Sequence, residues 1–262
     1  GLGDVYKRQK YLSLFLTLVV SSTAFAQLKD VAYSDKTQKL SGLAGIPNMP
    51  NKNNPGILVL PAWKGIDKHS EEVATELMKM GFYSFVADIY GADKRPKDAK
   101  EAGTKAGYYK SNIKEYQNRI SLALAELVKQ GANLDEIVVI GYCFGGTGAI
   151  EAARANMKVK GVVSFHGGLG KDEKREIIPI KAKVLVLHGA DDTYVPEKEI
   201  KAFQDEMRTA KADWQMNYYA NAVHAFTEKE AGNDNSKGAA YNELADKRSW
   251  SALKSFLREN FN

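Results

Sequence analysis

Short apolar segments alternate with amphipathic segments over most of this chain, and this alternation limits the fold more than any other feature of the sequence. Apolar runs of this length are typical of strands that are buried on both faces, as they are in parallel sheets. The expected strands cover residues 56–60, 82–87, 136–140, 159–165, 184–187 and 215–219, and the expected helices cover residues 70–80, 112–130, 145–155, 197–209 and 242–261. We therefore predict an α/β fold with a mainly parallel sheet and helices on both faces.

The chain beyond residue 26 shows no repeat, no low-complexity stretch and no long linker. Residues 31–33 and 40–44 flank a polar turn and predict an edge hairpin. We expect one domain over residues 27–262, which is long enough to bury a sizeable core. Ligands of such sheets bind beyond the carboxyl ends of the strands, so candidate residues are sought there.

The N-terminal segment has the pattern of a secretory signal peptide. Lys10 precedes the apolar run of residues 11–20, and Ala24-Phe25-Ala26 supplies the small residues that a signal peptidase needs. The run is shorter than the roughly 20 residues of a membrane span. We expect cleavage after Ala26 and a periplasmic or secreted protein with no membrane contact. Residues 1–9 are expected to be non-native, because residues 4–9 resemble the translated end of a transposon used in library preparation.

The charge distribution and the cysteine content exclude two features, a nucleic-acid partner and an internal disulfide. The formal net charge is +5, but the lysines are scattered among acidic residues and form no dense basic block. Nucleic acid is therefore not an expected partner. A single cysteine, Cys143, also excludes an internal disulfide. A free thiol risks oxidation outside the cytoplasm, which suggests that this one has a use.

Cys143 lies at the junction between an expected strand and an expected helix, in the sequence Ile-Gly-Tyr-Cys-Phe-Gly-Gly. In a G-x-S-x-G elbow, a tight strand-to-helix turn exposes the central residue beside the amides that begin the helix. Gly141 and Gly145 occupy the glycine positions here, and cysteine replaces serine. The pattern predicts that Cys143 is a nucleophile.

A nucleophilic thiol needs a base, and the chain has four histidines. His69 precedes a predicted surface helix and is expected to be solvated. His166 and His188 end apolar strands and are expected to be hydrogen-bonded structural residues. His224 lies in a loop between the last predicted strand and the terminal helix, at the expected active edge, so it is the best candidate for the base.

A carboxylate on the second ring nitrogen would hold the imidazole in one tautomer. Asp191 and Asp192 follow an expected strand, and either can take this role; alone, such a pair usually caps a turn. The chain order is then nucleophile, acid, histidine, which is the α/β-hydrolase order and not that of chymotrypsin or subtilisin.

No cofactor or metal site is expected. The histidines lack the short spacing of zinc ligands. The glycines at positions 141, 145 and 146 are not followed by the Lys-Ser/Thr of a phosphate-binding loop.

Three segments together resemble the signature segments of the dienelactone hydrolase family, and they occur in the family's order. They are residues 141–146 (Gly-Tyr-Cys-Phe-Gly-Gly), residues 188–196 (His-Gly-Ala-Asp-Asp-Thr-Tyr-Val-Pro) and residues 219–226 (Tyr-Ala-Asn-Ala-Val-His-Ala-Phe). Residues 58–65 and 85–91 also resemble the family, so the similarity covers roughly residues 30–260. It implies an α/β-hydrolase fold and selects Asp192 over Asp191. The implied triad is Cys143, Asp192 and His224.

Two backbone amides are expected to form an oxyanion hole. One is the N–H of Phe144, directly after the nucleophile, and the other comes from the loop after an early strand. The family pattern places the second donor at Trp63, whose side chain either lines the pocket or packs at the strand end.

The sequence departs from the family at substrate-binding positions. Ala62 replaces a glutamate that can engage the resting thiol, which leaves His224 alone to control the ionisation of Cys143. Glu228 replaces an arginine that binds the substrate carboxylate in relatives, and we expect it to repel such a group. A second family arginine has no clear match in this sequence: Ala92 stands nearest to its position, with Lys94 and Arg95 close by. Lys64 is either a replacement cation or a solvated side chain.

The residues and the resemblance together predict a hydrolase of small-molecule esters or lactones that forms a thioester acyl-enzyme. A thiol-based acyltransferase or peptidase would use the same residues with another acceptor or leaving group. A non-catalytic binding protein on the same scaffold is the third alternative.

Overall fold

The structure is a computed structural model that describes residues 27–261. The predicted signal peptide, residues 1–26, lies outside the described residues. Within the described range, no helix is long and apolar enough to cross a membrane.

An eight-stranded sheet forms the centre of the molecule, in the spatial order β1-β2-β4-β3-β5-β6-β7-β8. The pairs β1/β2 and β2/β4 are antiparallel, and all other neighbours are parallel. The strands are β1 (Lys29–Asp35), β2 (Gln38–Gly45), β3 (Gly56–Leu60), β4 (Tyr83–Val86), β5 (Ile137–Tyr142), β6 (Gly161–Phe165), β7 (Lys183–Gly189) and β8 (Trp214–Tyr219). All residues of the central strands β3, β5 and β6 are buried, as their apolar runs predict.

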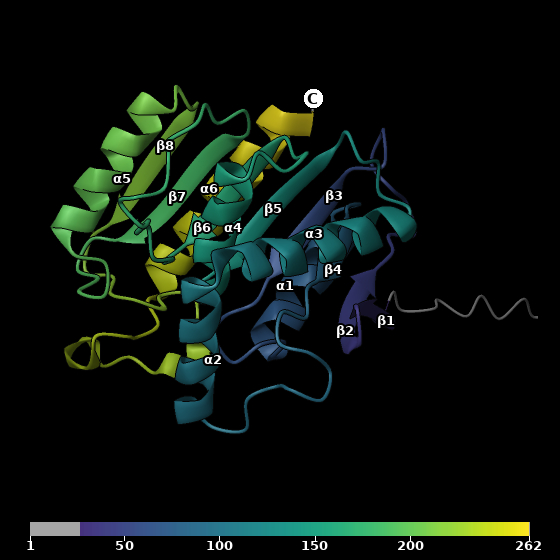
Figure 1. The fold of residues 1–262 in the computed structure, drawn as a ribbon, viewed down its shortest axis with the longest axis horizontal. Helices are drawn as coiled ribbons and strands as arrows, with labels where there is room; N and C mark the ends of the chain where they lie inside the picture. The colour runs from purple at the N-terminus through teal and green to yellow at the C-terminus, as the bar shows by residue number, and fades with distance from the viewer. Residues whose placement is uncertain (1–26, 262) are drawn as a thin grey trace, which may run out of the picture.

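Helices cover both faces of this sheet (Figure 1). Helices α1 and α6 pack on one face through one apolar cluster, and α3, α4 and α5 pack on the other through a second cluster. The helix α2 packs on α3. The helices are α1 (Lys68–Lys79), α2 (Ala99–Ser111), α3 (Ile113–Lys129), α4 (Phe144–Arg154), α5 (Glu197–Thr209) and α6 (Glu243–Phe261). The predicted α/β fold with a covered, mainly parallel sheet is confirmed.

The sequence prediction missed one helix, α2. Its N-cap is Asp98, whose side chain accepts from the amide of Glu101. Only Ala102, Ala106 and Tyr109 of this helix are buried, so its apolar stripe is narrow. Two glycines lower its helix propensity further. Packing on α3 therefore stabilises a helix that the sequence pattern alone does not indicate.

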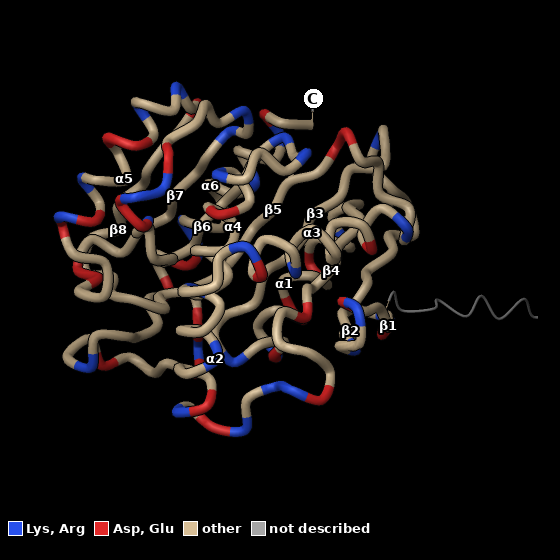
Figure 2. The backbone as a smooth tube through the Cα atoms, in the orientation of Figure 1, with Lys and Arg blue, Asp and Glu red and all other residues tan. Residues whose placement is uncertain are grey.

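The charged side chains follow the distribution expected from the sequence. Figure 2 shows Lys and Arg interspersed with Asp and Glu along the chain, without a block of one sign. Many of the ion pairs join residues three or four positions apart on the same helix, such as Lys79 with Glu76 and Lys247 with Glu243. Such exposed pairs contribute little to stability.

Candidate active site

The strand β5 ends at Tyr142, two residues beyond its predicted end, and α4 begins at Phe144, so Cys143 alone forms the turn between them. Its backbone has φ 51° and ψ −113°, a conformation that residues other than glycine rarely adopt. The backbone N–H of Cys143 donates to the carbonyl of Phe165 at 3.0 Å, which ties the turn to the neighbouring strand β6.

Glycines around Cys143 allow this turn because the backbones there approach too closely for side chains. A Cβ on Gly141 would lie 2.0 Å from the carbonyl oxygen of Gly145. A Cβ on Gly145 would lie 2.0 Å from the carbonyl oxygen of Leu60, at the end of β3. The first turn of α4 therefore sits directly against the loop that carries Trp63.

His224 lies between Cys143 and Asp192. Its Nε2 is 3.1 Å from the sulfur of Cys143, and its Nδ1 is 2.9 Å from Oδ2 of Asp192. The carboxylate is fully buried, and its other oxygen accepts from the backbone N–H of Tyr194 at 2.8 Å. The structure thus brings together three residues that the sequence separates by many positions, in the arrangement that a thiol, a base and an orienting acid require.

Asp191, the other acid left open by the residues alone, points elsewhere. Its side chain is exposed, and its backbone N–H donates to the carbonyl of Ala222 at 3.0 Å. Of the two aspartates, Asp192 is the one whose carboxylate contacts the imidazole of His224.

The charges of this group stabilise a thiolate beside an imidazolium. Burial by itself would raise the pKa of Cys143, but the hydrogen bond and positive charge of His224, together with Lys110 and the amide of Phe144, lower that pKa below its usual value. Burial would likewise lower the pKa of His224, but its bonds to Asp192 and Cys143 raise that pKa to about 10. Each member of the pair thus favours the charged form of the other.

The pH dependence of kcat/KM should reflect this pair. As pH falls through the lowered pKa of Cys143, the thiolate becomes protonated and activity is lost. As pH rises through about 10, His224 loses the proton that the leaving group needs, and activity falls again. We expect a plateau that begins below the pKa of about 8.5 of a free cysteine. Rates of iodoacetamide alkylation measured across the same pH range test the acid limb directly. Alkylation that follows a thiol of pKa about 8.5 would contradict this charge state.

The two expected oxyanion donors are the amide of Phe144, in the first turn of α4, and the amide of Trp63, in the loop after β3. The amide of Phe144 lies against the sulfur, where it contributes to the lowered pKa of Cys143. Across residues 27–261, the amide of Trp63 donates to no backbone or side-chain acceptor, so its N–H is available. The carbonyl of Trp63 accepts a hydrogen bond from the hydroxyl of Tyr90 at 2.7 Å. The Trp63 ring is half-buried against the core and lies near Gly103 of α2.

Tyr90 is a supporting residue that the sequence reasoning missed. Its ring stacks on Phe144 with centroids 5.8 Å apart, while its hydroxyl fixes Trp63, so one side chain contacts both expected donors. The only sequence signal is its place in the segment Asp-Ile-Tyr, after β4.

Replacing Tyr90 with phenylalanine should lower kcat about five- to tenfold with little change in KM, because one hydrogen bond of about 1 kcal/mol that orients Trp63 is lost. The matched control is Tyr108→Phe, which removes an exposed hydroxyl that donates to Glu115. Steady-state kinetics with an aryl ester measure both variants. Equal kcat values would show that Tyr90 does not support the hole.

The surroundings of His69 and Glu228 differ from those that the sequence predicts. His69 is not solvated: its side chain is only 16% exposed and packs edge-on against Tyr142. Its Nε2 lies 3.7 Å from Oε1 of Glu228, whose side chain is 14% exposed. Burial, aided by neighbouring acids and Cys143, raises the pKa of Glu228 to about 8. At neutral pH this carboxyl is therefore largely uncharged, and the expected charge repulsion is absent.

The other predicted residues lie as follows. His166 is buried, and its Nε2 is 2.8 Å from the hydroxyl of Thr227, as a structural histidine requires. His188 is also buried and packs edge-on against Tyr218, and within residues 27–261 its Nδ1 has no hydrogen-bond partner. The side chain of Lys64 is exposed. In the part of the chain that the structure describes, no group of three His, Cys, Asp or Glu residues is arranged to hold a metal ion.

The loop after β6 forms a wall beside the first turn of α4. A Cβ on Gly146 would lie 2.9 Å from the Cα of Gly167. Glu199 accepts from the amides of both Leu169 and Gly170, at 2.6 and 2.8 Å. Arg154 donates to the carbonyls of the same two residues, at 2.7 and 2.9 Å. Two charged side chains thus fix every polar backbone atom of this dipeptide.

The family assignment agrees with this geometry. The model of the dienelactone hydrolase family matches residues 40–261. The chain belongs to the dienelactone hydrolase family. A crystal structure of a dienelactone hydrolase-like promiscuous phosphotriesterase from metagenomic libraries is similar over 90% of this chain and 99% of its own, with 33% identity and a TM-score of 0.83.

Curated relatives of this dienelactone hydrolase-family protein include a Bradyrhizobium protein named as a probable 2-oxo-3-(5-oxofuran-2-ylidene)propanoate lactonase, 24% identical over 78% of this chain and 83% of its own. An uncharacterized protein of Caenorhabditis elegans is 34% identical over 46% of this chain and 78% of its own. Membership of this family makes the protein a hydrolase that acts on ester or lactone bonds.

Proposed function

We propose that this protein hydrolyses carboxylic esters or lactones through a thioester on Cys143, with His224 as the general base and acid and Asp192 as the residue that orients it. One observation carries this proposal: the imidazole of His224 contacts the sulfur at 3.1 Å and the buried carboxylate at 2.9 Å. These distances allow His224 to hold the proton of the Cys143 thiol and to pass it on without rearrangement.

In the resting pair, the proton of Cys143 is held by Nε2 of His224, and in the acylation step the thiolate sulfur attacks the carbonyl carbon. The N–H groups of Phe144 and Trp63 donate to the oxygen as negative charge develops on it. Each such donor typically lowers the barrier by about 3–4 kcal/mol. The tetrahedral intermediate then collapses, the C–O bond breaks, and His224 returns its proton to the alkoxide.

In the deacylation step, His224 takes a proton from water, and the hydroxide attacks the thioester carbonyl. The C–S bond breaks, the carboxylic acid leaves and the thiolate is restored. Asp192 stabilises the imidazolium in both steps, since its carboxylate accepts from Nδ1 throughout. A lactone would give a single hydroxy acid, because its acyl part and its alcohol part belong to one molecule.

The residues near the thiol favour uncharged substrates over dienelactone. Ala62 contributes no carboxylate, and Glu228 stands where relatives carry a substrate-binding arginine. The uncharged form of Glu228 offers a hydrogen bond in place of a positive charge. A substrate carboxylate would therefore lack its ionic partner at this position.

Trapping the intermediate tests the proposed mechanism. Mixing the protein with p-nitrophenyl acetate and quenching within milliseconds should give a burst of nitrophenol and a peptide with Cys143 heavier by one acetyl group. His224→Ala should show neither signal. Acetylation of another residue in the wild-type protein would sink the proposal.

Two alternatives share these residues. A thiol-based acyltransferase would form an ester or amide product when an alcohol or amine is added. A peptidase would cleave peptide amides as well as aryl esters. Product analysis by mass spectrometry separates both from a hydrolase. A binding protein on this scaffold would show no turnover and a thiol of ordinary reactivity.

A further inference from the structure

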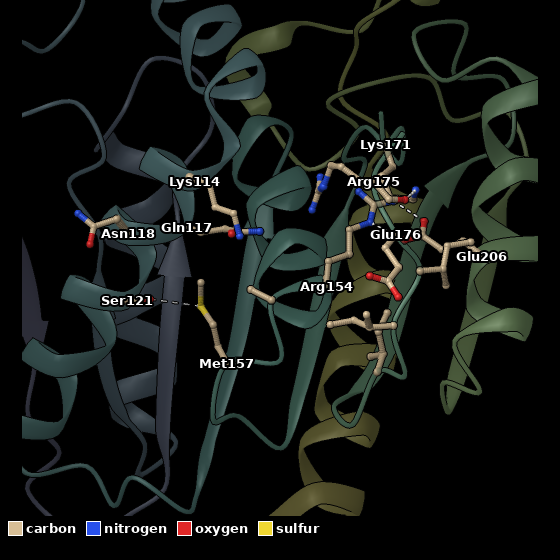
Figure 3. A pocket seen from close by; sticks show the side chains of 14 residues that line it. Lys114, Gln117, Asn118, Ser121, Arg154, Met157, Lys171, Arg175, Glu176 and Glu206 are labelled. Atoms are coloured by element: carbon tan, nitrogen blue, oxygen red, sulfur yellow. Dashed lines mark hydrogen bonds and ion pairs between the residues drawn. The ribbon is translucent and has the colours of Figure 1, made fainter. Parts of the chain in front are cut away.

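A cavity lies away from the thiol, between α3, the end of α4 and the loop of residues 171–180 (Figure 3). It has a volume of about 570 Å³, within the range of small-molecule sites. None of Cys143, His224 and Trp63 lines it. An occupant would therefore not contact the proposed catalytic residues.

The cavity wall combines apolar and cationic side chains. Ile177 and Ile178 are 38% and 42% exposed, which is unusual for isoleucine, and Met157 and Ile180 extend the apolar surface. Figure 3 shows Lys114 approaching from α3 on one side, with Lys171 and Arg175 from the loop on the other. The cavity thus offers apolar contact beside positive charge.

Most of the acidic groups near this cavity are already paired with arginine. Glu151 accepts from Nη1 and Nη2 of Arg175 at 2.9 and 2.8 Å and also bonds Arg154. Burial would raise the pKa of Glu151, but the two arginines hold that pKa below its usual value, so the carboxylate stays ionised. Glu206 accepts twice from Arg154.

The two lysines have no such partner. Within residues 27–261, no carboxylate lies within ion-pair distance of Lys114 or Lys171, and Lys171 donates to two backbone carbonyls. The charged residues that line the cavity are four cations, Lys114, Arg154, Lys171 and Arg175, and two carboxylates, Glu176 and Glu206. This lining favours an anionic ligand over a cationic one.

Hydrogen bonds within the protein hold part of the cavity wall in place. Arg154 uses its guanidinium to join Glu151, Glu206 and the carbonyls of residues 169 and 170, so it cannot move to fill the space. Glu151 holds Arg175 through Nη1 and Nη2, and within residues 27–261 the Nε–H of Arg175 has no hydrogen-bond partner. A preformed site loses less affinity to ordering when a ligand enters.

We propose that this cavity binds a carboxylate with an apolar tail. The carboxylate lies between Lys114, Lys171 and the free edge of Arg175, and the tail covers Met157, Ile177 and Ile178. Such a site is separate from the catalytic residues and would exist whether or not the proposed ester chemistry is correct.

Isothermal titration of the Cys143→Ala protein with octanoate tests this site. We expect saturable binding that weakens as salt concentration rises. The Lys114→Ala/Lys171→Ala double variant should bind at least tenfold more weakly. The matched control, Lys198→Ala/Lys201→Ala, removes two exposed lysines of α5 and should bind like the parent.

A second variant distinguishes this cavity from the site around residue 143. Ser121 is exposed at the cavity wall beside Met157, so Ser121→Trp should fill the space without disturbing the core. We expect loss of octanoate binding and, in the Cys143 protein, unchanged esterase activity. Absence of saturable binding, or binding that survives both the double lysine variant and Ser121→Trp, would overturn the proposal.

Discussion

Replacing Cys143 with alanine is expected to lower kcat for p-nitrophenyl acetate by about 10⁴- to 10⁶-fold, the range seen when a nucleophile is removed from a triad. Alanine leaves His224 and Asp192 in place but supplies no atom that can form the acyl-enzyme. The side chain of Cys143 is small and only partly enclosed, so the fold should tolerate the change. Initial rates over a range of ester concentrations measure the effect.

Cys143→Ser is the informative partner of this variant. It keeps the geometry but replaces the thiol with a hydroxyl, which His224 ionises far less readily at neutral pH. We expect activity well below wild type, and we expect that iodoacetamide does not abolish any burst that remains. Thermal melts should show that both variants remain folded. If Cys143→Ala retained wild-type turnover, the nucleophile would have to be sought elsewhere.

Asp192→Asn should lower kcat by about 10³- to 10⁴-fold, because the amide cannot stabilise the imidazolium and can favour the wrong tautomer of His224. The raised pKa of His224 depends on this carboxylate. The alkaline limb of the pH profile should therefore move to lower pH in the variant. Rates at several pH values separate this loss from a simple folding defect.

The neighbouring Asp191→Asn is a matched control, since it makes the same chemical change one residue away. Its side chain is exposed and does not contact His224. We expect activity within about twofold of wild type, because surface substitutions of this kind have small effects. A larger loss in Asp191→Asn than in Asp192→Asn would reverse the assignment of the acid.

Much of the fold could be predicted from the sequence because the central strands are uniformly apolar and the helices around them are amphipathic. The grouping of Cys143, Asp192 and His224 was also accessible, since each follows a strand whose carboxyl end lies at the same edge of the sheet. Their catalytic roles, like the signal peptide, stay predictions.

The environment of buried polar residues could not be predicted from the sequence. His69 looked solvated because it begins a surface helix, yet Tyr142 and Glu228, far away in the chain, enclose it. A sequence shows the identity of Glu228 but not the burial that raises its pKa. Similarly, the support that Tyr90 gives to Trp63 depends on a single tertiary hydrogen bond.

The close approach of backbones around the elbow limits how this site can change during evolution or design. Gly141, Gly145 and Gly146 admit no side chain without moving β3, β6 or α4. The identity of residue 143 can change within this frame, but the path of the chain around it cannot. New substrate preferences in proteins of this type should therefore arise in surrounding loops, such as those that carry Lys64 and Glu228, while the glycine frame is kept intact.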